Sequence, residues 1–174
     1  MNKRMFMILC RSIIQTAKVN KVKKIAVQFD TFKKFYNPQL VAENFEMANF
    51  DFNIFKARPE EGWDDIEEVL LYGTSSPEIE KSVKKGQEIG RAVNACRTLA
   101  NTPGGDMTPT LLAKAAKDAV KGLPVKVTVL GEKEMTKLGM GALLGVAKGS
   151  SEKPTFTIME YPSTSSGQAW AKQK

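Results

Sequence analysis

Histidine is missing altogether from the 174 residues of the sequence. Its absence excludes Ser-His-Asp and Cys-His nucleophile systems, and it also excludes every imidazole metal ligand. A metal bound by these residues would need carboxylate, carbonyl, amine or thiolate ligands. No nucleophile stands beside a convincing base, so the residues by themselves indicate no complete active site.

Cysteine is nearly missing as well. Cys10 and Cys96 are far apart in the sequence and form no Cys-x-x-Cys pair. This usage is typical of a protein in the reducing cytoplasm. Cys96 falls on the apolar stripe of an expected helix, which predicts a buried structural thiol instead of a catalytic one.

Long apolar runs are also absent. No run approaches the roughly 18 residues that a membrane-spanning helix needs. The apolar stretch at residues 5–10 is brief, Arg11 interrupts it, and no convincing small-residue cleavage site follows, so we expect no signal peptide. The sequence therefore predicts a soluble protein with no membrane contact, built as one ordinary domain or two small pieces.

Acidic residues are in the minority. The chain has 26 Lys and Arg against 19 Asp and Glu, a formal net charge of +7. Such a balance permits contact with an anionic partner. The basic residues are scattered, however, and the densest run, residues 18–24, is short. This pattern favours a solvated basic face over a nucleic-acid or membrane interface.

The first part of the chain combines helical and strand-like apolar patterns. We expect helices over residues 5–17 and 38–48, and strands over residues 25–29 and 66–72. Asn37 precedes Pro38, and proline is permitted in the first turn of a helix. Residues 49–55 carry alternating aromatic side chains and predict either a strand or the end of the second helix.

The longest helix is expected to begin at Pro77, with Ser76 as its N-cap and acidic residues in its first turn. Gly86 and Gly90 are four residues apart, so a neighbouring element can pack close against that face. The expected stripe consists of Ile79, Val83, Gly86, Ile89, Gly90, Val93, Cys96, Leu99 and Ala100.

Helix and strand patterns alternate again after Thr108, which is expected to cap a helix that starts at Pro109. This alternation predicts a mainly parallel, helix-covered sheet. Residues 162–174 are polar and without periodicity, which predicts a disordered end. The expected elements are a helix over 109–121, a strand over 125–130, a short helix over 131–138, and strands over 142–147 and 155–161.

A glycine-rich stretch, Gly139-Met-Gly-Ala-Leu-Leu-Gly145, is the first weak functional candidate. Its Gly-x-Gly-x-x-x-Gly spacing is one residue longer than the dinucleotide-binding fingerprint. It also follows a short helix, whereas the fingerprint follows a strand and opens a helix toward phosphate. We therefore expect no nucleotide binding at this stretch.

Clustered carboxylates and one lysine are the remaining candidates. The carboxylates are Glu60, Glu61, Asp64, Asp65, Glu67 and Glu68. Such a cluster can bind a hard cation, but the alternating ligands and central glycine of a calcium loop are missing, which favours a solvated acidic loop. Lys148, beside small residues in an expected loop, is weak evidence for a cleft.

The stretch from Arg97 to Thr110 reads Arg-Thr-Leu-Ala-Asn-Thr-Pro-Gly-Gly-Asp-Met-Thr-Pro-Thr. It resembles the junction at which the linking helix of leucyl aminopeptidases, also called cytosol aminopeptidases, enters the catalytic domain. Other segments resemble the same family in the family's order, and the resemblance covers about residues 20–161. These segments are residues 41–56, 86–102, 108–109, 127–150 and 154–161.

The resemblance implies an α/β fold with a partial macro-like N-terminal domain, a linking helix, and the start of a phosphorylase/hydrolase-like catalytic domain with a mainly parallel sheet. The matched residues Asn101, Thr102, Pro103, Gly139, Met140 and Gly141 would be scaffold. The implied division is residues 1–74 for the partial N-terminal domain, 75–102 for the linking helix, 103–161 for the beginning of the catalytic domain and 162–174 for the tail.

The resemblance also implies a cytoplasmic hexamer that removes N-terminal residues from peptides with two divalent metals, Zn²⁺ or Mn²⁺. In the family the ligands are a lysine, three aspartates and a glutamate, and a second lysine and an arginine assist. None of these positions can be carried over, because residues 162–166 stand where the family's first metal lysine is expected. We therefore assign no catalytic, cofactor-binding or metal residue, and expect an inactive fragment.

A different class of function is the alternative hypothesis. The chain would then be a non-catalytic module that docks on full-length subunits through the Gly86 and Gly90 helix face, or that contacts nucleic acid through its excess positive charge. A gene fragment without an independent role is the third hypothesis.

Overall fold

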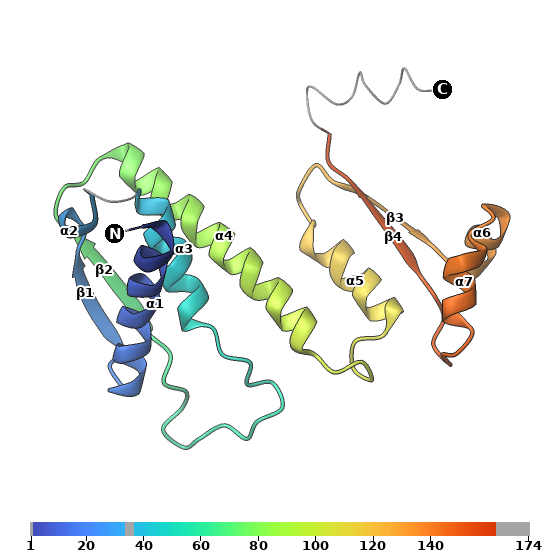
Figure 1. The fold of residues 1–174 in the computed structure, drawn as a ribbon, viewed down its shortest axis with the longest axis horizontal. Helices are drawn as coiled ribbons and strands as arrows, with labels where there is room; N and C mark the ends of the chain where they lie inside the picture. Colours follow the sequence, from blue (N-terminus) through green and yellow to red (C-terminus); the bar gives the residue numbers. More distant parts are fainter. Residues whose placement is uncertain (1, 34–36, 163–174) are drawn as a thin grey trace. The chain divides into compact units, whose positions relative to one another are not determined.

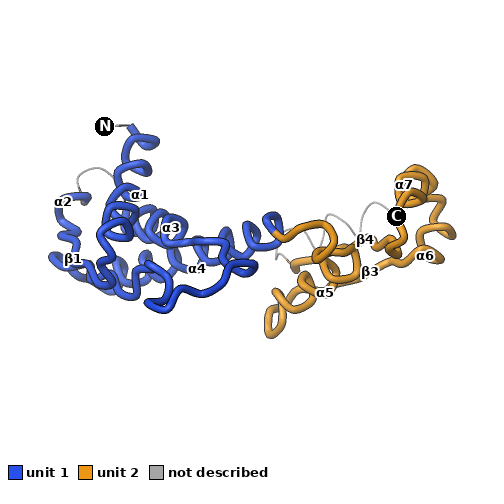
Figure 2. The backbone as a smooth tube through the Cα atoms, turned by 90° about the horizontal axis from the view of Figure 1, so that it is seen from below, with its two compact units in different colours: residues 1–101 blue, residues 102–174 orange. Residues whose placement is uncertain are grey.

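The structure is a computed structural model that describes residues 2–33 and 37–162. The chain divides into two compact units, Met1–Asn101 and Thr102–Lys174, shown in different colours in Figure 2. Each unit is described by itself. Residues 163–174 of the expected tail, which was given as residues 162–174, lie outside the described residues.

The first unit is an α/β unit with two parallel strands (Figure 1). Val27 pairs with Leu71 and Ile25 with Val69, which puts four apolar side chains on one face of the sheet. Its elements are α1 (Lys3–Val19), β1 (Lys24–Gln28), α2 (Asp30–Lys33), α3 (Pro38–Asn49), β2 (Glu68–Tyr72) and α4 (Pro77–Asn101).

The core of this unit lies among α1, α3 and the apolar face of the sheet. Cys10 is fully buried there, and burial raises the pKa of its thiol to about 11. Phe6 meets Phe32 edge to face, with ring centroids 5.6 Å apart. The buried cluster consists of Phe6, Cys10, Ile14, Ala17, Phe29, Phe32, Val41, Phe45, Ala48 and Ile66.

Helix starts agree with the capping residues of the sequence. The Asn37 side chain accepts a hydrogen bond from Leu40 N at 2.9 Å, one turn into α3. Ser76 Oγ accepts from Ile79 N at 3.3 Å at the start of α4. These side chains satisfy amides that have no carbonyl partner in a helical first turn.

The glycines of α4 allow a close approach to α3, as their spacing predicts. Gly86 and Gly90 are both buried. A Cβ placed on Gly90 would lie 2.5 Å from the Cβ of Glu46, and one placed on Gly86 would overlap the carbonyl oxygen of Gln39. Side chains at these two positions would therefore push the helices apart.

Of the two structures expected for residues 49–55, the strand does not form, and the end of the helix includes Asn49 alone. The helix ends at Asn49, and the following residues are a loop with one turn. Its rings still contact each other, since Phe52 and Phe55 have centroids 5.8 Å apart. Alternating aromatics therefore do not produce a strand here.

The second unit has a strand pair that is antiparallel. Thr128 lies opposite Ile158, so the expected mainly parallel sheet is wrong for these two strands, although the α/β class holds. Residues 142–147, expected as a strand, belong to a helix. The elements are α5 (Pro109–Ala119), β3 (Lys126–Leu130), α6 (Glu132–Lys137), α7 (Gly141–Ala147) and β4 (Phe156–Glu160).

The second unit buries little apolar surface among the residues that the structure describes. Its buried apolar side chains are Ala113 and Met135. Gly139 follows α6 with a φ of +69°, a conformation that glycine adopts without steric cost. None of the described helices is long and apolar enough to cross a lipid bilayer.

Candidate functional site

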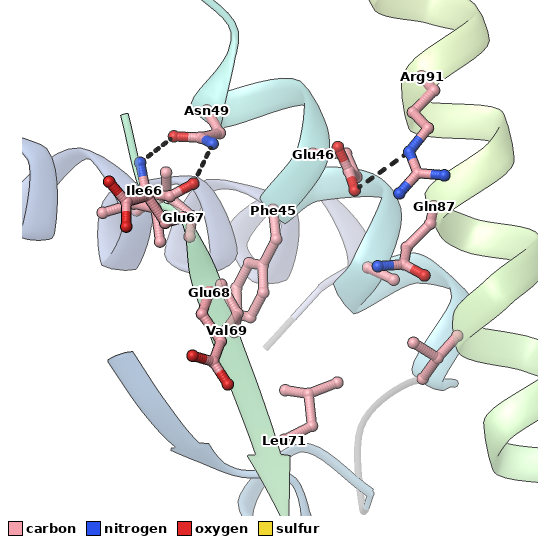
Figure 3. A pocket seen from close by; sticks show the side chains of 13 residues that line it. Phe45, Glu46, Asn49, Ile66, Glu67, Glu68, Val69, Leu71, Gln87 and Arg91 are labelled. Carbon is pink, nitrogen blue, oxygen red and sulfur yellow. Dashed lines mark hydrogen bonds and ion pairs between the residues drawn. The ribbon is translucent and has the colours of Figure 1, made fainter. Parts of the chain in front are cut away.

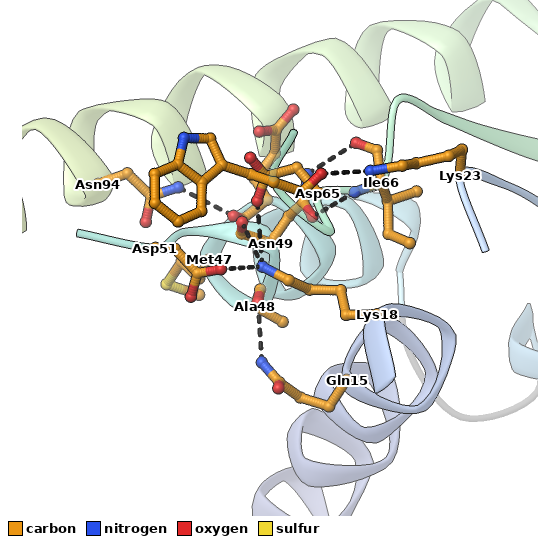
Figure 4. A network of polar contacts seen from close by, with 12 residues as sticks. Gln15, Lys18, Lys23, Met47, Ala48, Asn49, Asp51, Asp65, Ile66 and Asn94 are labelled. Carbon is orange, nitrogen blue, oxygen red and sulfur yellow. Dashed lines mark hydrogen bonds and ion pairs between the residues drawn. The ribbon is translucent and has the colours of Figure 1, made fainter. Parts of the chain in front are cut away.

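Polar side chains of the first unit converge on the C-terminal end of α3. The last four carbonyls of a helix have no partner within it. Here each receives a donor from another helix: Gln15 Nε2 donates to Ala48 O at 2.9 Å and Asn94 Nδ2 to Glu46 O at 2.9 Å (Figure 4). The other two donors come from Lys18 and Arg97.

Lys18 is the buried cation of this network. Its Nζ donates to Asn49 O at 3.1 Å, to Asp51 Oδ2 at 2.6 Å and to Asp65 Oδ1 at 3.2 Å (Figure 4). The Lys18 side chain is 9% exposed, whereas the two carboxylates are nearly half exposed. The two ion pairs of Lys18, with Asp51 and Asp65, therefore join the end of α1 to both ends of the loop at residues 50–65.

Arg97 completes the network from α4. Its Nη1 donates to Met47 O at 2.7 Å, and its guanidinium lies over the Phe50 ring, 4.2 Å from the centroid. Arg97 is the arginine that opens the stretch with family resemblance. In this structure it positions α4 on the end of α3, which is a structural role.

Asn49 performs a second bridging task. Its Nδ2 donates to Ile66 O and its Oδ1 accepts from Ile66 N, both at 2.8 Å (Figure 4). This two-point contact fixes the chain immediately before β2. Sequence reasoning missed the whole network, because its contacts between side chain and backbone join residues 17 to 50 positions apart and no local pattern marks them.

A hollow of about 210 Å³ lies between α3, β2 and α4 (Figure 3). Its walls combine apolar side chains with the carboxylates of Glu46, Glu67 and Glu68 and the guanidinium of Arg91. Arg91 Nε lies 3.8 Å from Glu46 Oε1. The set offers charge and apolar contact to a ligand, but it contains no nucleophile with a base.

A second hollow of about 500 Å³ continues along the same strand and helix. It shares four lining residues with the first, so the two form one groove between β2 and α4. We call it the β2–α4 groove. The shared residues are Val69, Leu71, Val83 and Gln87.

The acidic loop and the basic run of the sequence pair with each other. Lys21 Nζ lies 2.9 Å from Glu61 Oε2, and Lys24 Nζ lies 3.0 Å from Glu68 Oε2. The hydrogen bond from Lys21 lowers the pKa of the Glu61 carboxyl. Lys23 Nζ also donates to the carbonyl of Trp63. The two charged segments therefore neutralise one another, which leaves less charge for an external anion or cation.

The remaining residues that the sequence analysis considered as candidates do not belong to the polar network or to the two hollows. The glycine-rich stretch forms the turn before α7 and most of that seven-residue helix, and Lys148 is its exposed C-cap. Cys96, expected to be buried, is exposed. The expected stripe is wider than the face that α3 covers, so Ile89, Val93 and Cys96 lie on its open side.

Solved structures share the fold of this chain. A mutant of tomato leucine aminopeptidase superposes with a TM-score of 0.81 at 23% identity, covering 94% of this chain and 34% of that one. The bottromycin maturation enzyme BotP, solved in complex with Mn, gives a TM-score of 0.73 at 18% identity and covers 91% and 33%. The described elements thus share the fold of about one third of each of these two proteins.

Sequence comparisons agree. The model described as "Cytosol aminopeptidase family, catalytic domain" matches residues 94–172. A probable cytosol aminopeptidase of Solibacter usitatus is 32% identical over 92% of this chain and 33% of its own length, and one of Chlorobaculum tepidum is 44% identical over 56% and 20%. The chain belongs to the cytosol aminopeptidase family, and it spans about a fifth to a third of the length of these relatives.

The described residues do not fit the metal centre that the family implies. No group of three or more Asp, Glu, Cys or His side chains in residues 2–33 and 37–162 is arranged to hold a metal ion. In the acidic loop, the densest set of carboxylates, the oxygens of Asp65, Glu61 and Glu68 instead pair with the ammonium groups of lysines.

Proposed function

We propose that this chain is the scaffold part of a two-metal aminopeptidase that removes N-terminal residues from peptides. The observation that carries the proposal is the alignment of 92% of the chain with one third of a probable cytosol aminopeptidase. In the intact enzyme two divalent metals, Mn²⁺ or Zn²⁺, would supply a bound hydroxide and polarise the scissile carbonyl. The catalytic and metal-binding groups would come from other residues.

The role of the described residues is to build and join two units. The first unit fixes α4 on α3 through the glycine contact and through Asn94 and Arg97. α4 ends at Asn101, the last residue of the first unit, and the second unit begins at Thr102. We propose that α4 is the helix that links the N-terminal and catalytic domains of the enzyme, in a cytoplasmic hexamer.

Activity measurements on the pure chain test the first half of this proposal. The 174-residue protein is incubated with leucine p-nitroanilide and either Mn²⁺ or Zn²⁺, beside a full-length cytosol aminopeptidase as the positive control. We expect no release of nitroaniline above the metal blank. Metal-dependent turnover by the pure chain would overturn the assignment of a non-catalytic scaffold.

Sequencing the source DNA tests the second half. The reading covers all three frames through and beyond codon 161. A continuation with a Gly-Lys-Gly segment and an Asp-Ser/Thr-Gly-Gly motif supports the parent aminopeptidase. A genuine stop after codon 174 without that continuation contradicts it and favours a separate binding module.

Such a module would have to use another surface than the one that the sequence suggested. The Gly86 and Gly90 face is covered by α3. The basic run at residues 18–24 is paired with the acidic loop, which weakens the case for nucleic acid.

A further inference from the structure

The chain between α3 and β2 forms a long exposed loop. Residues 54–61 are all exposed and belong to no helix or strand. Two short turns organise the loop: Lys56 N donates to Asn53 O at 3.0 Å, and Gly62 N donates to Pro59 O at 2.9 Å. Because few contacts are lost when such a segment opens, opening it costs little free energy. Exposed segments of this kind are preferred sites of proteolytic cleavage.

Both ends of this loop are tied to the helices of the first unit. Lys18 Nζ lies 2.6 Å from Asp51 Oδ2 and 3.2 Å from Asp65 Oδ1, so one buried cation bonds the two sides of the loop (Figure 4). On the first side, the guanidinium of Arg97 also lies over the Phe50 ring. The middle of the loop can therefore open while its ends stay in place.

The segments before and after the loop hold each other by contacts that do not involve its middle. β1 pairs with β2 along its whole length. The side chain of Asn49 bonds both backbone groups of Ile66 at 2.8 Å. Gly86 and Gly90 of α4 pack directly on α3. The covalent link through the loop is thus one connection among several.

The sequence of the loop contains two basic residues, Lys56 and Arg58. Either side chain is suitable for an endopeptidase that cuts after a positive charge. Arg58 is followed by Pro59, whose fixed φ and missing N–H hinder the extended, hydrogen-bonded fit of a substrate. Lys56 is followed by Ala57, which has neither restriction. The bond between Lys56 and Ala57 is therefore the better substrate.

We propose that the loop at residues 50–65 is a proteolytic processing site, at which a trypsin-like serine endopeptidase cuts between Lys56 and Ala57. The first unit then keeps its fold as a non-covalent pair, residues 1–56 with the residues from 57 onward. In the cleavage, water adds across the broken C–N bond: its hydroxyl goes to the carbonyl carbon of Lys56 and its hydrogen to the nitrogen of Ala57. The new carboxylate and ammonium lie in the exposed part of the loop, so their solvation costs nothing in buried charge.

Limited digestion of the full 174-residue chain with trypsin tests the site of cleavage. Mass spectrometry at successive times identifies the fragments, and cuts in the second unit are distinguished by their masses. We expect a fragment that ends at Lys56 and a new N-terminus at Ala57, because cleavage inside a helix first requires local unfolding. Degradation of the first unit without a prior cut after Lys56 would overturn the proposal.

Size-exclusion chromatography of the same digest tests the persistence of the fold. We expect residues 1–56 to elute together with the fragment that contains β2 and α4, and the helical circular dichroism of the first unit to remain. Separate elution of the two fragments with loss of the helical signal would show that the intact loop is required, and the proposal would fail.

Two pairs of variants sharpen these tests. Lys56→Gln is expected to abolish the cut, whereas Arg58→Gln, also at an exposed position of the loop, leaves its rate unchanged. A cut that persists in Lys56→Gln contradicts the assigned bond.

The second pair concerns the contact of Lys18 across the cut. In the nicked protein, Asp65→Ala removes the ion pair that joins the two fragments and is expected to lower the urea concentration at which they separate. Asp64→Ala, an exposed neighbour, is the control and should leave that concentration unchanged. Equal values for the two variants would show that Lys18 does not hold the fragments together.

Discussion

The two units differ most in how they treat their apolar residues. The first unit closes a core in which Phe6, Cys10 and Val41 are fully buried. In the second unit, the buried apolar side chains among the described residues are those of Ala113 and Met135, and its large apolar side chains are partly or largely exposed, as some also are in the first unit. The exposed ones of the second unit are Leu111, Leu112, Leu123, Leu138, Val146, Phe156, Met159 and Tyr161.

This difference shows what each unit needs in order to be stable. A two-stranded sheet is marginal in water unless helices cover it. The first unit meets that condition with α1 and α3 over one face, whereas β3 and β4 pair mainly with each other. The first unit is therefore expected to hold its fold by itself, and the second to depend on additional packing.

Hydrogen exchange gives the largest expected contrast. Amides of β3 and β4 are expected to exchange at least about a hundredfold faster than those of α1 and α3, because local opening is cheap where few apolar contacts are lost. Mass spectrometry of peptic fragments measures both regions in one sample. Equal protection would show that the two units unfold as one, and the comparison would fail.

Gly86→Ala tests the packing of the stable unit. The added methyl group would overlap the Gln39 carbonyl, a backbone group that cannot rotate away. We expect a loss of about 1–3 kcal/mol in the free energy of unfolding, measured with urea. Lys85→Ala, an exposed neighbour on α4, is the control and should stay within about 0.5 kcal/mol.

Lys18→Met tests the network at the end of α3. The change leaves Asn49 O and the Asp51 carboxylate without their donor, with an expected cost of about 1–3 kcal/mol. The matched control is Lys21→Met, whose partner Glu61 is exposed, and it should not change the midpoint of unfolding. An equal effect of the two changes would show that burial of Lys18 adds nothing.

Acid titration gives the smallest effect, and it falls in the second unit. Hydrogen bonds from Lys121 at 2.7 Å and Lys114 at 2.9 Å lower the pKa of Asp118 from 3.8 to about 2. Because the pKa of Asp118 is lower in the folded state than in the unfolded state, the ionised carboxylate stabilises the folded state above the unfolded-state pKa. This stabilisation is lost as the pH falls through the folded-state pKa. Helix α5 should therefore fray between about pH 4 and pH 2.

Carbon-detected NMR of the Asp118 carboxyl, followed through an acid titration, measures its pKa. Replacing both Lys114 and Lys121 by Met should return its pKa toward the ordinary value. A pKa that stays near 2 without the lysines would assign the shift to another cause.

Sequence patterns predicted the ends of elements better than their partners. Asn37, Ser76 and Thr108 with the prolines after them marked three helix starts, because a cap is a contact within one turn. The prediction of a strand at residues 142–147 was wrong. A short apolar run is compatible with a strand or a helix, and its surroundings in the fold decide which one forms. The prediction of parallel strands was wrong for β3 and β4, which are antiparallel. The direction of pairing depends on residues about 30 positions apart in the sequence, so no local pattern shows it.

The candidate site was the least accessible to sequence reasoning. The spacing of Gly86 and Gly90 predicted that a neighbouring element packs close to α4, but the sequence did not show that this element is α3. The exposure of Cys96 was not predicted because the apolar stripe of a helix can be wider than the face that a neighbouring helix covers. The sequence does not show which residues of the stripe are covered. The hollow between α3, β2 and α4 depends on how these three elements assemble, which no local sequence pattern shows.

The capped end of α3 also sets an order of events during synthesis. Gln15 and Lys18 are made before α3, but Asn94 and Arg97 follow Glu46 and Met47 by 48 and 50 residues. A nascent chain on the ribosome therefore carries an incompletely bonded last turn of α3 until α4 has left the exit tunnel. The first unit can reach its final state only when its last helix is complete.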